Sequence, residues 1–351
     1  MGILSSVIIE FIKSFSFKGS QQAKGTHRKV TKMKSCGSMH LIGSPNSFSA
    51  HSKSGQKGQN QDRFIVWDEF GQKFDTMFCG VFDGHGPWGH YVAKKVRDSL
   101  PSSLLDTLLE RETGEHSQQS AWEYSLVKSC AAVDFQLRHR RDINTFNSGT
   151  TALALLRQVL SGTLHLSAIV IIYLLQGRNI VIANVGDSRA VLGSLSDEGN
   201  MVAVQLTVDF KPDLPQEKTR IIESGGRVAC LSDEPGVRRV WGPDEESPGL
   251  ATSRSLGDFC LKEYGVISVP EIIHRRISED DKFVILATDG LWEVVSNEEA
   301  VKIVWETKEK EEAAELLVKY ASSVWKSKMK GFAMDDITVI CIFFHPTSYR
   351  L

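Results

Sequence analysis

Short acidic motifs, far apart along the chain, carry the residue types that hold divalent cations. They are Asp62, Asp83-Gly84-His85-Gly86, Asp289-Gly290 and Asp335-Asp336. In the second motif an apolar run over residues 77–82 ends in a carboxylate, beside a glycine backbone that other groups can approach closely and an imidazole that can carry a proton. Because the other motifs also stand at the end of apolar runs or just before them, the pattern predicts one oxygen-rich metal site built from distant strand ends.

The chemistry expected of such a site is metal-assisted hydrolysis. Mg²⁺ and Mn²⁺ prefer carboxylate, carbonyl and water oxygens, so Asp83 could bridge two ions and Gly84 could lend its carbonyl. Two such ions polarise a phosphoryl oxygen and acidify a shared water into a nucleophile, while a histidine such as His85 could protonate the leaving alkoxide. A covalent nucleophile is not predicted, because the chain has no Gly-x-Ser-x-Gly motif and no cysteine in an active-site-like loop.

Each motif taken alone has a simpler interpretation. Asp-Gly is common in turns, Asp335-Asp336 could be a solvated strand start, and a single histidine in a glycine loop is more often structural. The combination of the motifs is what favours a metal site.

The elements that must position these residues are short strands and a few helices. β-branched segments bounded by Gly, Asp or Pro predict strands over 63–67, 77–82, 150–156, 179–185, 190–193, 201–206, 228–231, 283–287 and 337–344. Helices are expected over 89–100, 120–141, 297–307 and 310–326, with candidate capping boxes at Ser120/Glu123 and Ser296/Glu299. Because the helices fall between groups of strands, the order favours packed antiparallel sheets with helices outside over a doubly wound parallel sheet.

The composition is that of a soluble globular protein. Of 351 residues, 41% are hydrophobic and 24% charged, and the net charge of −2 gives no global field that would favour nucleic acid. The cysteines form no Cys-x-x-Cys pair, so a reducing compartment is expected instead of a disulfide framework or zinc site. We expect a mobile basic tail over 1–45, one domain over 46–345 and a short C-terminal tail over 346–351.

The first residues fit a lipidation pattern. Met1-Gly2-Ile3-Leu4-Ser5-Ser6 matches the N-myristoylation signal with Gly2 as acceptor, and the basic residues over 13–34 could supply the second signal that a single acyl chain needs. The alternative is a tail in which Gly2 is coincidental. No basic segment precedes the apolar residues, so a secretory signal is not predicted. We expect a cytoplasmic location, with the nucleus and peripheral attachment to the plasma membrane as alternatives.

An apolar stretch over 159–176 interrupts the strand pattern. It holds no charged side chain unless His165 is protonated, yet Ser, Gly and Thr make it too short and too mixed for a good transmembrane helix. Three interpretations stay open: a lengthened hairpin, an insert that exposes apolar surface, or a segment translated from a retained intron. Sequencing of transcripts tests the last of these.

Further phrases along the chain resemble a known enzyme family. They are Phe82-Asp83-Gly84-His85-Gly86, Ser148-Gly149-Thr150-Thr151-Ala152, Val185-Gly186-Asp187-Ser188-Arg189, Leu206-Thr207-Val208-Asp209-Phe210-Lys211-Pro212, Arg254-Ser255-Leu256-Gly257-Asp258, Ala287-Thr288-Asp289-Gly290-Leu291-Trp292 and Asp335-Asp336-Ile337-Thr338-Val339. Their order is similar to that of the type 2C, metal-dependent serine/threonine protein phosphatases, over about residues 46 to 345. Asn60-Gln61-Asp62 and Trp241-Gly242-Pro243-Asp244 look like a plant branch of that family.

The resemblance implies a fold and a place for the site. The expected fold is α+β, a central sandwich of two antiparallel β-sheets flanked by α-helices on both faces, in four layers α-β-β-α. A centre for two Mg²⁺ or Mn²⁺ ions would lie at one end of the sandwich. The segment from about 209 to 250 matches a flap beside the active site, where substrates would be selected.

The resemblance also implies a role for each matched residue. Asp83 matches the bridging ligand, Gly84 the carbonyl ligand, and Asp289 and Asp335 the remaining direct ligands. The outer positions are matched by Asp62, which would act through metal-bound water, by His85 as general acid, by Asp187 as candidate for a third, weaker metal, and by Asp258 as an acidic neighbour and possible ligand.

Two positions depart from the family pattern. Gln61 stands where many relatives have Glu, which removes a charge from the outer shell of the site. Lys57 stands where animal relatives have the phosphate-binding Arg, so a point charge replaces a bidentate fork. Neither change removes a direct metal ligand.

The favoured function is metal-dependent dephosphorylation of phosphoserine and phosphothreonine in proteins, by a monomer. The alternative is a catalytically impaired module with the same fold that binds a kinase or receptor. Gln61, Lys57 and the apolar insert favour the alternative slightly, whereas the complete carboxylate set argues more strongly against it.

Overall fold

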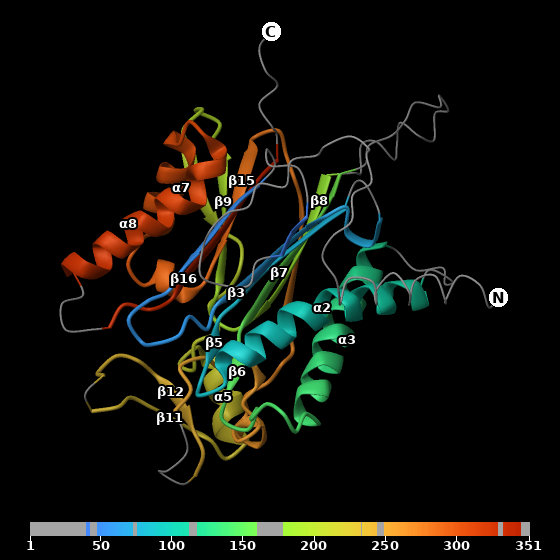
Figure 1. The fold of residues 1–351 in the computed structure, drawn as a ribbon, viewed down its shortest axis with the longest axis vertical. Coiled ribbons are helices and arrows are strands. Elements are labelled where there is room, and N and C mark those ends of the chain that lie inside the picture. Colours follow the sequence, from blue (N-terminus) through green and yellow to red (C-terminus); the bar gives the residue numbers. More distant parts are fainter. Residues whose placement is uncertain are drawn as a thin grey trace, which may run out of the picture. The chain divides into compact units, whose positions relative to one another are not determined.

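The computed structural model describes residues 40–42, 48–72, 76–111, 118–159, 178–232, 234–243, 249–328 and 333–344 (Figure 1). All of them belong to one compact unit, Lys34–Leu351. The tail predicted over 1–45 lies outside the described residues apart from one short strand, and so does the apolar stretch apart from its first residue, Val159.

The first layer of strands is a six-stranded sheet. Its order is β1 (His40–Ile42), β3 (Arg63–Asp68), β4 (Thr76–Phe82), β7 (Ala152–Val159), β8 (Arg178–Val185) and β14 (Glu271–Arg276). Neighbouring strands are antiparallel except β1 and β3, which are parallel. Every residue of β4 is buried, which explains why this strand reads as an unbroken apolar run.

The second layer is a five-stranded antiparallel sheet. Its order is β10 (Met201–Gln205), β9 (Arg189–Leu195), β15 (Asp281–Ala287), β16 (Ile337–Phe343) and β2 (Phe48–Lys53). Between the two sheets lies an apolar core to which both contribute, including Val66, Leu153, Ile182, Val284 and Ile340, each fully buried. The sheets therefore pack face to face as a sandwich.

Helices cover the outer face of each sheet. On the six-stranded sheet lie α2 (Gly89–Arg111) and α3 (Gln118–Arg138), and on the five-stranded sheet lie α7 (Asn297–Glu306) and α8 (Ala313–Lys328) (Figure 1). Each pair buries its own apolar cluster against the strands. The predicted four-layer α+β sandwich is thus confirmed. None of the helices that the structure describes is long and apolar enough to cross a membrane.

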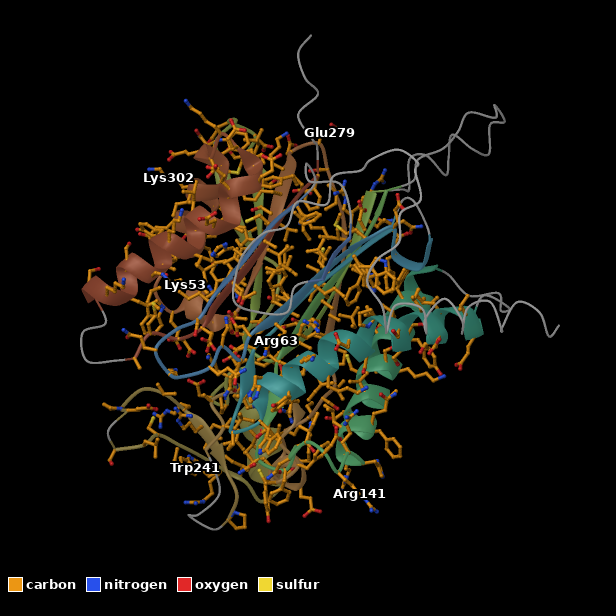
Figure 2. The ribbon with its side chains drawn as sticks, in the orientation of Figure 1. Lys53, Arg63, Arg141, Trp241, Glu279 and Lys302 are labelled. Atoms are coloured by element: carbon orange, nitrogen blue, oxygen red, sulfur yellow. The ribbon has the colours of Figure 1, made fainter. Side chains whose placement is uncertain are left out.

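Smaller elements gather at one end of the strands. They are a ribbon of β5 (Gly84–His85), β6 (Gly149–Thr150) and β13 (Leu256–Gly257), the flap elements α5 (Pro215–Glu223), β11 (Arg227–Ala229) and β12 (Arg239–Trp241), the short helix α6 (Asp289–Trp292) and the 3-10 turn η2 (Lys262–Tyr264). Two further 3-10 turns lie at the opposite end: η1 (Phe70–Gln72), which follows β3, and η3 (Lys310–Glu312), where the Glu311 carbonyl accepts from Ser49 Oγ near the start of β2. In Figure 2, Trp241 marks the flap and Glu279 the loop before β15, at opposite ends of the sandwich. β15 therefore runs toward the flap.

Two helix boundaries differ from the sequence prediction. The capping box predicted at Ser120 and Glu123 is wrong, because α3 already begins at Gln118 and both residues lie inside it. α2 does not stop at Leu100 but continues through Pro101 to Arg111, since Leu104 on the next turn is fully buried and adds packing that offsets the lost hydrogen bond. The box at Ser296 and Glu299 is confirmed, with both reciprocal hydrogen bonds present.

Candidate active site

The six-stranded sheet brings two of the predicted carboxylates to one edge. β4 ends at Phe82, which pairs with Arg63, the first residue of β3. Asp83 follows the one strand and Asp62 precedes the other, so antiparallel pairing places both at the same sheet end. The Asp83 amide donates to Thr151 Oγ1 over 3.1 Å, and the Thr151 amide donates to the Asp83 carbonyl over 2.9 Å, which fixes the chain just where β4 ends.

The five-stranded sheet delivers two more carboxylates in the same way. β15 ends at Ala287, paired with Val339 of β16, so Asp289 after β15 and Asp335 before β16 share an end. Thr288 joins the two sheets, because its hydroxyl donates to Asp62 Oδ2 over 2.8 Å. The antiparallel registers therefore assemble distant motifs into one region.

Burial and mutual repulsion perturb these carboxylates. Burial, followed by the charge of Asp289, holds the pKa of Asp83 well above its usual range. Burial, followed by the charges of Asp187 and Asp335, raises the pKa of Asp289 to about 7. Burial and then Asp336 likewise hold the pKa of Asp62 well above its usual range. Such a crowd of desolvated like charges is typical of a functional site.

Two lysines partly neutralise this region. Lys57 Nζ pairs with Asp335, and Lys211 Nζ pairs with Asp187. Burial alone would lower the pKa of Lys211, but attraction to Asp187 and then Asp289 raises it. The acidic region thus attracts positive charge, and two lysine side chains of the chain itself supply part of it.

The donor set fits hard divalent cations. Asp62 Oδ1 is buried and makes no hydrogen bond, and the neighbouring acids contribute oxygen only. In the part of the chain that the structure describes, no three carboxylate, imidazole or thiol groups converge at ligating distance. Their repulsion, expressed in the raised pKa values of Asp83 and Asp289, is what bound cations would relieve.

Gly84 has no room for a side chain. A Cβ there would lie 2.5 Å from the Gly89 carbonyl oxygen and 2.7 Å from the Gln61 carbonyl oxygen. Gly84 pairs with Thr150 in the short ribbon, so its backbone is held beside Asp83. The close approach explains why this loop requires glycine next to the carboxylate.

His85 and Asp258 form a hydrogen-bonded pair. His85 Nε2 lies 2.7 Å from Asp258 Oδ2, which also accepts from Ser255 Oγ over 2.6 Å. Burial alone would lower the pKa of His85, but the charge and hydrogen bond of Asp258 raise it. Asp258 adopts a left-handed backbone conformation, with φ of 51°, which carboxylate residues tolerate better than most.

Several residues near the site were not assigned a role from the sequence. Glu293, whose pKa is raised first by burial, lies one helical turn after Asp289, and that spacing was the available signal. Lys211 lies inside one of the family motifs, but no local pattern indicates that it pairs with Asp187, which stands 24 positions earlier. Asp336 accepts from the amides of Gly55 and Gln61, each over 2.7 Å, and so closes the loop that carries Lys57.

A separate cavity of about 240 Å³ lies at the other end of the strands. Its lining includes Thr76, Trp122, Asn179 and His274, which stand at the start of β4 and β8 and on neighbouring elements. Since Asp83 and Asp187 follow the opposite ends of those two strands, this cavity is not part of the carboxylate region.

Comparisons with known proteins agree with this geometry. The family model "Protein phosphatase 2C" matches residues 46–326. "Probable protein phosphatase 2C 34" of Arabidopsis thaliana is 48% identical over 371 residues, covering 99% of each chain. "Probable protein phosphatase 2C 48" of Oryza sativa subsp. japonica is 49% identical, covering 89% of this chain and 88% of the relative.

A solved structure shows the same fold. The serine-threonine phosphatase 2C from Toxoplasma gondii superposes with a TM-score of 0.72 at 24% identity, covering 85% of this chain and 94% of that one. With a matching family model over most of its length and near-full-length plant relatives, the chain belongs to the protein phosphatase 2C family, in its plant branch, and is a protein serine/threonine phosphatase.

Proposed function

We propose that the carboxylate region performs metal-dependent dephosphorylation of phosphoserine and phosphothreonine in proteins, with a water-derived nucleophile. The observation that carries the proposal is the crowd of desolvated, mutually repelling carboxylates delivered by the ends of both sheets, next to an imidazole already bonded to an acid. Among the described residues no serine or cysteine hydrogen-bonds the His85 ring, and this favours an attack by solvent.

The residues that would hold metal follow from their oxygen chemistry. Asp83, the Gly84 carbonyl, Asp289 and Asp335 would bind two Mg²⁺ or Mn²⁺ ions directly, and Asp62 would act through water. Asp187 is the candidate for a weaker third ion and Asp258 for an outer contact. When bound, such ions polarise the phosphoryl group and acidify water.

The chain's own groups supply the rest of the chemistry. Because His85 Nε2 is bonded to Asp258, which fixes the ring, Nδ1 would be the nitrogen that passes its proton to the departing seryl or threonyl oxygen. The half-exposed Lys57 offers a positive charge to the incoming phosphate. α5, β11 and β12 border the site as the flap, where we expect the substrate protein to make contact.

Hydrolysis of a phosphoserine peptide with added Mn²⁺ tests the proposal. We expect Asp83→Ala to abolish the turnover and Asp142→Ala, which removes an exposed carboxylate elsewhere, to leave it unchanged. Turnover that survives Asp83→Ala, or that persists with EDTA, would contradict the two-metal mechanism. If the protein binds Mn²⁺ but hydrolyses no phosphopeptide, the module that docks a kinase or receptor becomes the better account.

Partners and location extend this proposal. Phosphoproteins are the substrates that the family implies, and a kinase or receptor is the further partner we propose. We also propose a cytoplasmic or nuclear protein, acting as a monomer, that reaches the plasma membrane where Gly2 is acylated. The mass of the N-terminal peptide from plant tissue tests the acylation.

A further inference from the structure

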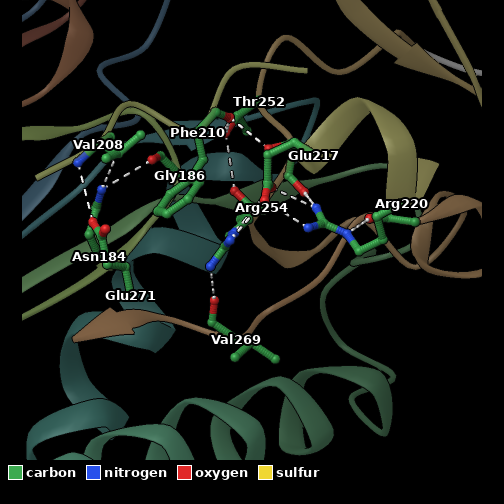
Figure 3. A network of polar contacts seen from close by, with 12 residues as sticks. Asn184, Gly186, Val208, Phe210, Glu217, Arg220, Thr252, Arg254, Val269 and Glu271 are labelled. Atoms are coloured by element: carbon green, nitrogen blue, oxygen red, sulfur yellow. Dashed lines mark hydrogen bonds and ion pairs between the residues drawn. The ribbon is translucent and has the colours of Figure 1, made fainter. Parts of the chain in front are cut away.

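A buried carboxylate on the flap, outside the proposed metal ligands, is the centre of a large polar network (Figure 3). Glu217 on α5 is only 2% exposed. Its Oε1 accepts from Arg220 and Arg254, each over 2.8 Å, and its Oε2 accepts from Arg220 over 2.7 Å and from Arg254 over 3.1 Å. One carboxylate therefore holds two guanidinium groups, in the bidentate manner that arginine favours.

The network ties α5 to separate stretches of chain. The Arg254 guanidinium lies 3.6 Å from the centre of the Phe210 ring and donates to the Val269 carbonyl over 3.0 Å. Arg220 donates to the carbonyl of Gly265 over 2.9 Å. The segments around 210, 254 and 265–269 are thus fixed by a single acid.

The segment around 254 leads directly to the proton-donor pair. Ser253 Oγ donates to Glu217 over 2.6 Å, and the next residue but one, Ser255, donates its hydroxyl to Asp258 over 2.6 Å. Asp258 in turn bonds His85. Glu217 is therefore linked to the imidazole through the Ser253 hydroxyl, the backbone from Ser253 to Ser255, and the hydrogen bonds from Ser255 and His85 to Asp258.

We infer that Glu217 is a positioning residue for proton transfer, which holds residues 253–258 so that Asp258 presents His85 to the leaving oxygen. The inference rests on the proposed function, because it needs His85 as the proton donor. Glu217 itself contacts no proposed metal ligand.

The chemistry of the side chain explains why a carboxylate is needed. In Glu217→Gln the shape is kept, but an amide NH₂ would face the N–H groups of a guanidinium, donor against donor. Two partly buried cations would then share one neutral acceptor. The segment that leads to Asp258 would shift, and even a small displacement of a proton donor lowers the reaction rate strongly.

A structural role and a positioning role for Glu217 differ in their dependence on the leaving group. The alkoxide of phosphoserine needs a proton as it departs, whereas para-nitrophenolate leaves without one. Loss of fold or of metal lowers turnover of both substrates alike. Misplacement of His85 lowers turnover of the phosphoserine peptide selectively.

The test measures kcat of the full-length protein with Mn²⁺ on a phosphoserine peptide and on para-nitrophenyl phosphate. For Glu217→Gln we expect kcat on the peptide to fall by about tenfold or more and kcat on para-nitrophenyl phosphate to change by less than about threefold. Asp281→Asn, which breaks the ion pair of another buried acid with Arg275 at the start of β15, remote from the flap and from Asp289, is the matched control and should leave both values unchanged. If Glu217→Gln does not fold, Arg254→Lys probes the same clamp.

A second readout needs neither metal nor substrate. In metal-free protein, the ¹⁵N resonances of the His85 ring, assigned with His85→Asn, report its bond to Asp258. Glu217→Gln should shift them and Asp281→Asn should not. An equal fall in turnover of both substrates, no fall at all, or an unshifted resonance overturns the inference.

The reference variant His85→Asn separates this inference from the proposed function. If His85→Asn shows the selective loss on the peptide and Glu217→Gln does not, only the positioning role of Glu217 is wrong. If His85→Asn shows no selectivity, the assignment of His85 as proton donor is wrong, and the role of Glu217 is overturned with it.

Discussion

Replacing Asp289 with Asn should stabilise the metal-free protein while it removes activity. The pKa of Asp289 is about 7 in the fold against 3.8 for the unperturbed group, because burial and the charges of Asp187 and Asp335 oppose ionisation. A raised acid pKa means that stability present below pH 4 is lost as the pH rises toward 7. Each pH unit in that interval corresponds to roughly 1.4 kcal/mol, so ionised Asp289 destabilises the fold by at most about 4 kcal/mol.

Solvent reduces this figure. Asp289 is partly exposed, and water screens part of the repulsion, so we expect Asp289→Asn to raise the free energy of unfolding by about 2 kcal/mol at pH 8. Asparagine does not titrate, and therefore the gain should shrink toward zero near pH 4.

Urea unfolding in EDTA at several pH values measures the effect, with Asp142→Asn as the control for an exposed acid. With Mn²⁺ the order should reverse, since a ligand at 100 times its Kd stabilises by about 2.7 kcal/mol and the variant would bind more weakly. If Asp289→Asn is no more stable than the natural protein at pH 8, or if its gain is the same at pH 4 and pH 8, the repulsion described above is not the cause.

Three further predictions concern the site and its supports. Gly290→Ala should destabilise the protein by roughly 2 kcal/mol or more in thermal unfolding, because the new Cβ would lie 2.0 Å from the Asp336 carbonyl oxygen; an unchanged midpoint would contradict that packing. Lys57→Met should raise KM for phosphopeptide by about tenfold with a smaller effect on kcat, while Lys57→Arg should lower KM; equal kinetics for both would show that Lys57 does not meet the phosphate. Burial alone would raise the pKa of Glu217, but hydrogen bonds from Arg220 and other partners lower it to about 2. Ionised Glu217 therefore contributes about 3 kcal/mol to the free energy of unfolding above pH 4.5, and this contribution is lost as the pH falls toward 2. In Glu217→Gln the free energy of unfolding, measured by circular dichroism, should depend less on pH over that interval.

The sequence predicted best what depends on local pattern. The apolar run before Asp83 and the capping box at Ser296 are encoded within a few residues, and both are confirmed. The position of Asp83 after a strand and of Asp289 after another could be read directly, because the carboxylate ends each run. Their convergence required in addition that the strands pair in register and that the two sheets pack face to face.

Features that depend on remote partners could not be read in this way. α5 was missed because its short segment buries only Ile221 and the charged Glu217, and a buried acid is intelligible only with Arg254 beside it. The start of α3 was misplaced because Ser120 with Glu123 satisfies the capping pattern equally well inside a helix. Local pattern therefore fixes where carboxylates stand, whereas tertiary contacts decide which of them are neutralised.

The hairpin of β7 and β8 keeps its register up to the pair Val159 and Arg178, at the end of the strands remote from Asp83. The free energy of closing a connection grows only slowly with its length, so residues 160–177 can lengthen or shorten without moving the paired strands. A change in the length of this connection is therefore expected to leave the carboxylate end of the strands in place. The same position would accept an inserted reporter domain, whose presence should leave hydrolysis at the opposite end intact.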